Sequence, residues 1–527
     1  MNVHEELTIT DFIVVGAYIL ILVGIGFWVS IRQKNSGDGN LFLAGNSLNW
    51  TSIGFTMWGT NVGPSMLIAS ASIGYTTGVV AGNFAWYAFI FIFLLAVVFA
   101  PRYMGARVQT LPEFMGKRFG DTTRGILAWY TIVTILISWL SLTLFAGGIL
   151  IQQMLGIPMW LSIIVLIIIA AFFTIAGGLK AIAYTNVFQM VLLIVVSLAL
   201  TITGVFEVGG LDGLLAKTPD HYWNLLLPTD DASYPWHAIL LGYPVMGVWF
   251  WCTDQSMVQS VLGAKNNKQG QLGSNFTAWL KILDVPLFIL PGILCFILYP
   301  DLQNPDEAYM TMVTSMFPQG MIGLVMAVLI AALVSTIDSA LNALSTVFTM
   351  DVYVKKYKPD ATGKQVVKIG RVVTVIGAVI AIFITLAINS IKGLNLFDIF
   401  QSILGFIAPP MSVVFLFGVL WKRSTTKATN FILLFGTFLS LGVGVFYLWI
   451  FPAADYPFWP HFLMLSFYIF VLLSILIVVI SLLDKSQHQF KSTLDYGTLP
   501  KLSPTAKVLW VSLFVVMIGL YLLFNGH

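Results

Sequence analysis

The chain has 527 residues, of which 58% are hydrophobic and only 9% are charged, with a formal net charge of +3. Soluble domains carry roughly 25% charged residues, so this composition excludes a soluble globular protein and predicts a polytopic membrane protein. The few basic residues lie in separate loops instead of one patch, which argues against a nucleic-acid partner. Cys252 and Cys295 both lie in apolar stretches, so no disulfide framework is expected.

Apolar stretches recur along the whole chain at a length that suits a bilayer. A membrane-spanning helix needs about 20 predominantly apolar residues. Such stretches lie near 10–31, 48–71, 81–104, 125–152, 158–176, 187–209, 237–263, 275–299, 319–350, 370–390, 397–421, 428–450, 460–482 and 506–524. We therefore expect an all-α polytopic membrane protein with about 14 transmembrane helices, embedded in a lipid bilayer.

The loops between these stretches alternate in charge. If the N-terminus lies outside, almost every basic residue falls in an inward loop. The exceptions are Lys217 and Lys392, which lie outside, and Lys281, which lies within a span. Inward loops of membrane proteins carry an excess of Lys and Arg. We therefore expect an integral protein of the plasma membrane or bacterial inner membrane, with both termini outside.

The second stretch carries the signals of a broken helix. Gly59, Gly63 and Pro64 lie near its middle, where glycine loosens a helix and proline removes a backbone donor. Pro244, which follows Gly242, is expected to interrupt the seventh stretch in the same way. Broken helices five stretches apart indicate inverted repeats with a binding site near the midplane. Plain kinks are the alternative, because Gly and Pro are common in membrane helices.

The ninth stretch, 319–350, has a polar centre. It contains Ser335, Thr336, Asp338 and Ser339 within five residues. A carboxylate at the centre of a membrane helix costs about 3 kcal/mol or more, so it is by default a candidate functional group. Residues spaced by three or four share a helix face, and their hard oxygen atoms suit Na+ or H+. The alternative is that the hydroxyls bond their own helix and the carboxylate faces a neighbouring helix.

A few other polar groups lie in apolar stretches. Lys281 and Asp284 are three residues apart, which allows either a structural ion pair or a solute contact. Asp254 lies near the inner end of the seventh stretch, where a gate or loop anchor is expected, and Gln401 can hydrogen-bond a polar ligand. Several aromatic residues can stack on a sugar or form gates, although most aromatics of such a protein face lipid. They are Trp86, Tyr87, Trp249, Phe250 and Phe397.

Short motifs along nearly the whole chain resemble the sodium/solute symporter family, most closely its sodium/glucose cotransporter branch. They are FLAGNSLNW at 42–50, GGLKAIAYTNVFQ at 177–189, WCTDQ at 251–255, LPGI at 290–293, ALVST at 332–336, FTMDVY at 348–353, LFDIFQS at 396–402 and FLFGVLWKR at 415–423. The resemblance implies a five-plus-five inverted-repeat core with broken helices. The expected parts are an accessory helix in 1–46, the first repeat in 47–209, an outer loop and the second repeat in 210–421, and accessory helices in 422–527.

The resemblance also implies a sodium site between the first and eighth helices of the core. The matching residues are Gly59, Val62, Ala332, Ser335 and Thr336. Members with a second sodium ion carry an Asp where this chain has Asn186, and this chain has Asp338 where a hydroxyl would stand. We therefore hypothesise that Asp338, Ser339 and Asn186 form a second cation site or a proton site.

For the solute, the resemblance implies contacts from Gln401 and Lys281, an inner gate at Phe250 and an outer gate at Phe397. This chain departs from the sugar-carrying members at Met66, Ala85 and Gly247, where polar residues are replaced. Losing hydroxyl partners matters because discrimination of a polyol depends on paired hydrogen bonds. Residues that can compensate are Ser65, Asn83 and Asn395.

Together these features predict sodium-coupled secondary active symport of a small polar solute by alternating access, with Na+ as coupling ion and a sugar or polyol as solute. The alternative is a sodium-coupled carrier of a monocarboxylate, sialic acid or another organic anion. The fourth stretch has no Arg or Lys where sialic-acid members carry their cation, which counts against this alternative unless Lys281 substitutes. A channel fits broken helices less well, and no membrane-embedded His or Cys constellation indicates an enzyme.

Overall fold

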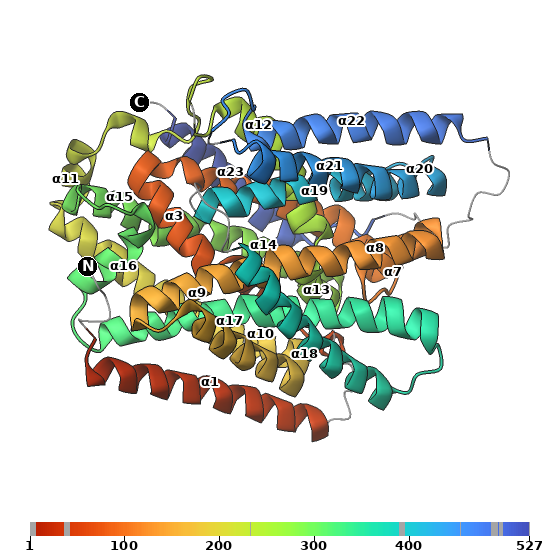
Figure 1. Cartoon of the computed structure of the whole chain (residues 1–527), viewed down its shortest axis with the longest axis horizontal. Coiled ribbons are helices and arrows are strands. Elements are labelled where there is room, and N and C mark those ends of the chain that lie inside the picture. Colours follow the sequence, from red (N-terminus) through yellow and green to blue (C-terminus); the bar gives the residue numbers. More distant parts are fainter. Residues whose placement is uncertain are drawn as a thin grey trace.

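Helices account for the architecture because backbone polar groups within a bilayer must be hydrogen-bonded inside the chain. The computed structural model describes residues 7–35, 43–231, 233–388, 396–453, 455–485, 494 and 499–525. Within these ranges the only strand-like pairings are two isolated bridges, Leu48 with Ala264 and Leu227 with Pro235. Long helices such as α1, α8, α17 and α22 run along the longest axis of the molecule (Figure 1). The predicted all-α fold is confirmed.

Ten helical stretches of the described chain are long and apolar enough to cross a membrane. They are Met66–Gly105, Asp121–Gln152, Ile182–Glu207, Asn267–Leu298, Met321–Tyr357, Gly363–Ile388, Ile399–Leu420, Thr426–Ile450, Phe462–Leu483 and Pro504–Leu523. Two shorter apolar helices are Ile9–Ile25 and Met159–Phe172. Each predicted apolar stretch overlaps helices of the described chain, while the number of fourteen crossings stays a prediction.

The helices of the first half are α1 (Ile9–Asn35), α2 (Trp50–Asn61), α3 (Pro64–Thr77), α4 (Gly82–Trp86), α5 (Ala88–Leu94), α6 (Ala100–Gly105), α7 (Leu111–Phe119), α8 (Asp121–Thr134), α9 (Leu142–Leu155), α10 (Met159–Glu207) and α11 (Gly210–Lys217). Those of the second half are α12 (Trp236–Val248), α13 (Gln255–Leu262), α14 (Asn267–Leu280), α15 (Leu290–Leu298), α16 (Ala308–Met316), α17 (Met321–Val347), α18 (Gly363–Ile388), α19 (Leu396–Leu420), α20 (Thr426–Phe431), α21 (Thr437–Val445), α22 (Phe462–Leu483) and α23 (Pro504–Leu523).

α10 joins two predicted stretches, 158–176 and 187–209, in one continuous helix of 49 residues. The sequence between them contains no proline, so every backbone donor needed to continue the helix is present. At 1.5 Å per residue such a helix is far longer than a bilayer is thick. Of its two apolar parts, Ile182–Glu207 is long enough to cross a membrane, and Met159–Phe172 is a shorter apolar segment.

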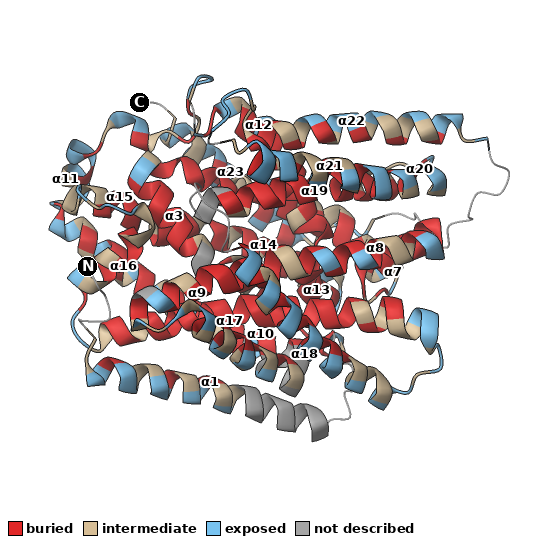
Figure 2. Cartoon of the chain, viewed as in Figure 1, coloured by how far each residue is buried: buried red, intermediate tan, exposed pale blue. Residues whose placement is uncertain are grey.

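α17 runs through the middle of the bundle and packs against α1, α2, α10 and α18. All of its 27 residues except Met321 and Leu324 are buried. Figure 2 shows this buried centre, whereas α1 and α22 alternate between buried and exposed residues at the periphery. Many exposed side chains of these outer helices are large and apolar, for example Leu20 on α1 and Ile475 on α22. An apolar periphery around a polar-centred helix is the arrangement expected in lipid.

The predicted break in the second stretch is confirmed. α2 ends at Asn61 and α3 begins at Pro64, and between them Val62 (φ −85°, ψ 71°) and Gly63 (φ −83°, ψ 158°) leave the helical conformation. The backbone N–H groups of Val62 and Gly63 donate to the carbonyls of Trp58 and Asn61. The Val62 bond is the last regular helical one, whereas the N–H of Gly63, which would bond the Gly59 carbonyl in a continuous helix, bonds Asn61 instead.

The predicted break at Pro244 is wrong. Pro244 lies inside the continuous helix α12, and the seventh stretch breaks instead at Asp254, where the backbone is extended (ψ 130°). The Asp254 side chain accepts hydrogen bonds from the backbone of Ser256 and Met257 and caps α13. It also accepts one from Trp139 Nε1 at 3.0 Å, so Asp254 is a structural anchor at this helix start. A single proline removes one backbone bond, whereas a side-chain cap gives a new helix start a stable end.

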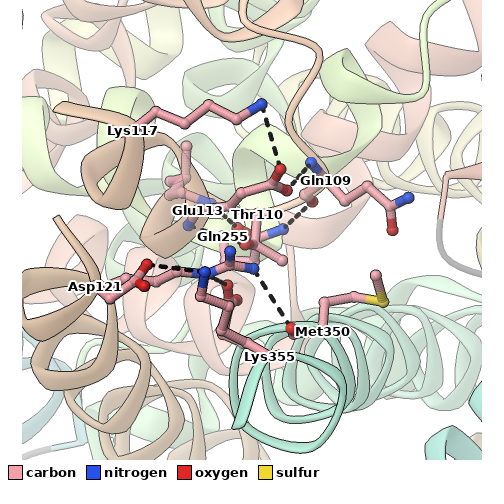
Figure 3. A network of polar contacts seen from close by, with 11 residues as sticks. Gln109, Thr110, Glu113, Lys117, Asp121, Gln255, Met350 and Lys355 are labelled. Carbon is pink, nitrogen blue, oxygen red and sulfur yellow. Dashed lines mark hydrogen bonds and ion pairs between the residues drawn. The ribbon is translucent and has the colours of Figure 1, made fainter. Parts of the chain in front are cut away.

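Charged side chains gather where α7, α8 and α13 meet η11 (Phe348–Tyr357), a π-helical continuation of α17. Arg124 Nε and Asp351 Oδ1 are 2.6 Å apart, and the Asp351 side chain is fully buried. Figure 3 shows the neighbouring pair of Lys355 with Asp121, 3.0 Å apart and largely exposed. Gln255 at the start of α13 accepts from the backbone N–H of Leu111, which ties α13 to α7.

Candidate ion and solute site

The break between α2 and α3 faces hydroxyl groups of α17. Thr336 Oγ1 lies 3.3 Å from the Thr60 carbonyl and 3.2 Å from the Ala332 carbonyl, within hydrogen-bond distance of both. Ser335 Oγ donates to Asn186 Oδ1 on α10 at 2.7 Å. Both side chains are buried. Three helices that are far apart in sequence thus bring oxygen atoms together beside the break.

These oxygen atoms are arranged so that they can still accept a cation. A hydroxyl has one hydrogen and two lone pairs, and Ser335 and Thr336 direct their hydrogens to other oxygens. The bypassed carbonyl of Gly59 lies on the same broken helix as the carbonyl of Thr60 that Thr336 contacts. Neutral carbonyl and hydroxyl oxygens are hard ligands, which suit Na+. The structure brings the α2 and α17 parts of the predicted sodium group, which also includes Val62 and Ala332, into contact; sodium binding itself stays a prediction.

Asp338 lies one turn further along α17. Its side chain is 1% exposed, and its Oδ1 lies 3.4 Å from Ser339 Oγ, which also receives a bond from Thr60 at 3.1 Å. No cation lies within ion-pair distance of Asp338 among the side chains that the structure describes. Asn186 bonds Ser335, and its Nδ2 is buried without a hydrogen-bond partner. The residues of the predicted second cation or proton site therefore form two hydrogen-bonded pairs. Asp338 pairs with Ser339, and Asn186 pairs with Ser335.

A cavity opens beside the helix break. It is lined by Asn61, Gly63, Met66, Phe84, Trp139, Thr143, Tyr243, Met246, Trp249, Phe250, Trp251, Thr336, Phe400, Gln401 and Leu404. None of these described lining residues is charged, and aromatic rings form much of the wall. A mostly apolar cavity with a few convergent polar groups is typical of a small-molecule site.

Some of the residues predicted to contact the solute line the cavity, and others do not. Met66, Phe250 and Gln401 line the cavity. Phe250 also packs against Trp139, with ring centroids 5.1 Å apart, as a gate beside the solute would require. The side chains of Ser65 and Phe397, and Asn395 as a whole, lie outside the described part of the chain.

Asn83 and Trp86 are engaged elsewhere. The Asn83 amide donates to the carbonyls of Val80 and Leu225, and its oxygen accepts from Tyr521 on α23. Trp86 Nε1 donates to the carbonyl of Ile282 at 3.2 Å. Neither residue belongs to the lining of the cavity, so in this conformation their side chains hold the fold around it.

Lys281 and Asp284 form the ion pair that was one of the two alternatives. Lys281 Nζ contacts Asp284 Oδ2 and donates to Asn61 Oδ1 at 2.6 Å. The second carboxylate oxygen, Asp284 Oδ1, accepts from Trp58 Nε1 at 2.8 Å. Lys281 is 1% exposed and does not line the cavity, but Asn61 does. Lys281 therefore reaches the cavity wall through Asn61.

Sequence reasoning missed Asn61 and Thr143 as lining residues. Asn61 is the last residue of α2, directly before the unwound Val62, and its position next to the predicted break was the signal available. Thr143 is a single hydroxyl in the apolar helix α9, and nothing local distinguishes it from a hydroxyl that bonds its own helix. Its side chain was placed at the cavity only by packing.

Comparison with known proteins gives a consistent result. The model of the sodium:solute symporter family matches residues 41–436. Sodium/myo-inositol cotransporter 2 of Homo sapiens is 32% identical over 483 residues, covering 85% of this chain and 71% of the relative. Sodium/glucose cotransporter 4 of Danio rerio is 32% identical over 470 residues, covering 82% of this chain and 70% of the relative.

Among solved structures, a Na+-coupled sialic acid symporter in a substrate-bound outward-open state is similar to this chain. The TM-score is 0.78, and the match covers 92% of this chain and 100% of the solved chain, at 19% sequence identity. This likeness establishes the fold, including the predicted inverted-repeat architecture with broken helices.

Proposed function

The chain belongs to the sodium:solute symporter family, and we propose on this basis that its solute is an uncharged sugar or polyol. It is a membrane transporter, not an enzyme, and it couples a small solute to sodium. Such carriers work by alternating access around a site near the midplane of the membrane.

The uncharged cavity wall is the observation that carries the assignment of the solute. An organic anion held in a low-dielectric cavity requires a cation or an equivalent set of donors. The described lining offers amide and hydroxyl groups and aromatic faces, and Lys281 is already bonded to Asp284 and Asn61. A polyol instead matches amide and hydroxyl partners such as Gln401. The relatives named for myo-inositol and glucose transport point to the same class.

The proposed sodium site and the solute cavity share a residue. We assign the ion to the Gly59, Val62 and Ala332 carbonyls and the Ser335 and Thr336 hydroxyls. Thr336 lines the cavity as well as facing the break. An ion that draws α2 and α17 together therefore changes the cavity wall. A ligand shifts a conformational equilibrium only through differential affinity, so sodium must favour the conformation that binds solute well.

A second cation or proton site is assigned to Asp338, Ser339 and Asn186. Its support is a buried carboxylate whose described surroundings supply hydroxyls and no positive charge. Such a group is costly in a membrane interior unless an ion or a proton compensates it.

We place both termini on the outer side, in keeping with the charge of the loops. The Arg124–Asp351 pair then lies at the inner end and closes α8 against η11. The Lys355–Asp121 pair lies at the same junction (Figure 3). Phe250 is assigned to the inner gate and Phe397 to the outer gate. Inward movement of sodium along the membrane potential supplies about 2.3 kcal/mol per charge per 100 mV. Uptake should therefore be electrogenic.

The function is tested by uptake into proteoliposomes. The purified chain is reconstituted, and labelled myo-inositol, D-glucose and lactate are offered with an inward sodium gradient or with choline in its place. We expect sodium-dependent uptake of a neutral probe, enhanced by a potential negative inside. Sodium-dependent uptake of lactate alone would overturn the sugar assignment in favour of an organic anion.

A further inference from the structure

Lys281 is a buried cation with a partner on each of three sides. An ammonium group has three N–H donors. One bonds Asp284 and a second bonds Asn61 Oδ1 at 2.6 Å. The remaining side of Nζ faces the ring of Trp251, 5.8 Å from its centroid, within the range of a cation–π contact. The ammonium group therefore contacts Asp284, Asn61 and the Trp251 ring, and it does not itself line the cavity.

Asp284 is the residue that neutralises this cation, and it is itself held from two sides. It lies between η8 (Lys281–Leu283) and η9 (Val285–Ile289), and it is 5% exposed. One carboxylate oxygen contacts Lys281, and the other accepts from Trp58 Nε1 at 2.8 Å. Trp58 is fully buried on α2 and stacks on Phe288. Both partners of Asp284 are therefore fixed in position.

The pair lies directly behind the cavity wall. Asn61 and Trp251 line the cavity, and both touch Lys281. Lys281 donates to Asn61 Oδ1, so the Asn61 side chain lies between the ammonium group and the cavity. A lysine freed from Asp284 would therefore lie one side chain from the solute, and an attracting charge would be added to an otherwise uncharged site.

We propose that Asp284 is a specificity-determining residue: by pairing with Lys281 behind the wall, it keeps the cavity neutral and excludes carboxylate-bearing solutes. The proposal rests on the proposed function and refines it, since it explains how a site that contains a lysine favours an uncharged solute. Specificity of this kind comes from withholding a favourable contact from the wrong ligand. Asp284 acts through Lys281 and does not touch the solute.

The test compares neutral and anionic probes on the purified full-length protein in sodium buffer by thermal shift. The neutral probes are myo-inositol and D-glucose, and the anionic probes are D-glucuronate and lactate. The wild-type protein should be stabilised by a neutral probe and by neither anion. Asp284→Asn, which keeps an acceptor for Trp58, should gain stabilisation by an anion, with an apparent affinity at least about 10-fold tighter, because charge-assisted hydrogen bonds are the stronger ones.

Two controls separate the cation from other effects of the substitution. Lys281→Met combined with Asp284→Asn should lose the gained anion response, because no freed cation remains. Asp301→Asn makes the same change of net charge at an exposed position after α15, and it should leave probe preference as in the wild type. An Asp284→Asn protein that still rejects both anions overturns the proposal, and so does a gain that persists in the double variant.

The outcomes of the two proposals are distinguishable. If the wild-type protein is stabilised only by an anion, the proposed sugar or polyol function fails. If the wild type prefers a neutral probe and Asp284→Asn does not gain an anion, only the specificity role fails. Should Asp284→Asn not be recovered as a folded protein, Asp284→Ser frees the same cation. Recovery of the double variant but of neither single variant assigns the pair to folding alone and overturns the proposal.

Discussion

Asp284 and Asp338 are both buried in the helical core, yet they are compensated in different ways. Asp284 is 5% exposed and has a lysine and an indole N–H as partners. Asp338 is 1% exposed and has a neighbouring hydroxyl, with no cation among the described side chains. A buried carboxylate needs compensation. The chain supplies it to Asp284 by a lysine, and in the second site that we propose a mobile ion or proton supplies it to Asp338.

The two carboxylates differ in whether they can bind a cation from solution. A carboxylate with a built-in cation is closed to other cations, and its role is to hold structure and to set the charge of the cavity. A carboxylate that faces only neutral oxygens can change its occupant during a transport cycle. Burial alone therefore does not identify an ion site, whereas burial together with the identity of the partners does.

The largest expected effect comes from leaving Asp284 without its lysine. Lys281→Met should lower the free energy of unfolding by about 3–5 kcal/mol, because breaking a buried pair leaves one uncompensated charge. Thermal unfolding of the purified protein measures the loss. Lys281→Met with Asp284→Leu should recover most of it, since a buried pair replaced by apolar residues is often neutral in stability. A single variant as stable as the wild type would show that Asp284 is compensated by something else.

The next largest effect is expected at Asp338, the carboxylate without a cation partner among the described side chains. Asp338→Asn should remove one coupled charge and lower steady-state accumulation by about 50-fold at 100 mV, the equivalent of about 2.3 kcal/mol. Stability should change little or rise, in contrast to Lys281→Met, because the substitution removes a buried charge instead of exposing one. The sodium-to-solute ratio and the pH dependence of uptake in proteoliposomes provide the measurement. Unchanged values for both would remove Asp338 from the ion pathway.

A smaller effect is expected at the first ion site. Ser335→Ala removes one proposed sodium ligand and the donor to Asn186, and it should raise the sodium concentration for half-maximal uptake by about 10-fold, near the upper end of a single hydrogen bond's contribution. Ser345→Ala is the matched control on the same buried helix. Its hydroxyl bonds the Gly370 carbonyl at 2.8 Å, away from the site. Equal sodium dependence in the two variants would contradict the assignment.

The smallest effect concerns the ion pairs in the network where η11 meets α8 (Figure 3). Arg124→Gln should speed amide hydrogen exchange in η11 about fivefold, equal to about 1 kcal/mol, because it breaks a pair whose carboxylate is fully buried. Lys355→Gln breaks an exposed pair, 40% and 73% exposed, and should change exchange very little. Equal responses of the two variants would show that burial does not decide the strength of these pairs.

Local features of the sequence predicted much of the fold. Apolar stretches of bilayer length became helices, and Gly63 with Pro64 ended α2 because a missing N–H acts within one turn. The same reasoning failed at Pro244, which stays inside α12, because one lost bond can be tolerated where the surrounding helix is packed. The break at Asp254 depends on a side chain that caps α13 and is held by Trp139, a contact across 115 residues.

The sequence by itself determined the membrane class, the broken helix and the presence of a carboxylate at the centre of α17, because each depends on composition or on neighbours within a few residues. Tertiary structure decided which polar groups meet. Lys281 bonds Asn61 across 220 residues, and Asn83 turns to the backbone of Leu225 instead of the cavity. Side-chain direction depends on how helices pack, and residue spacing within one helix carries no information about a partner on another.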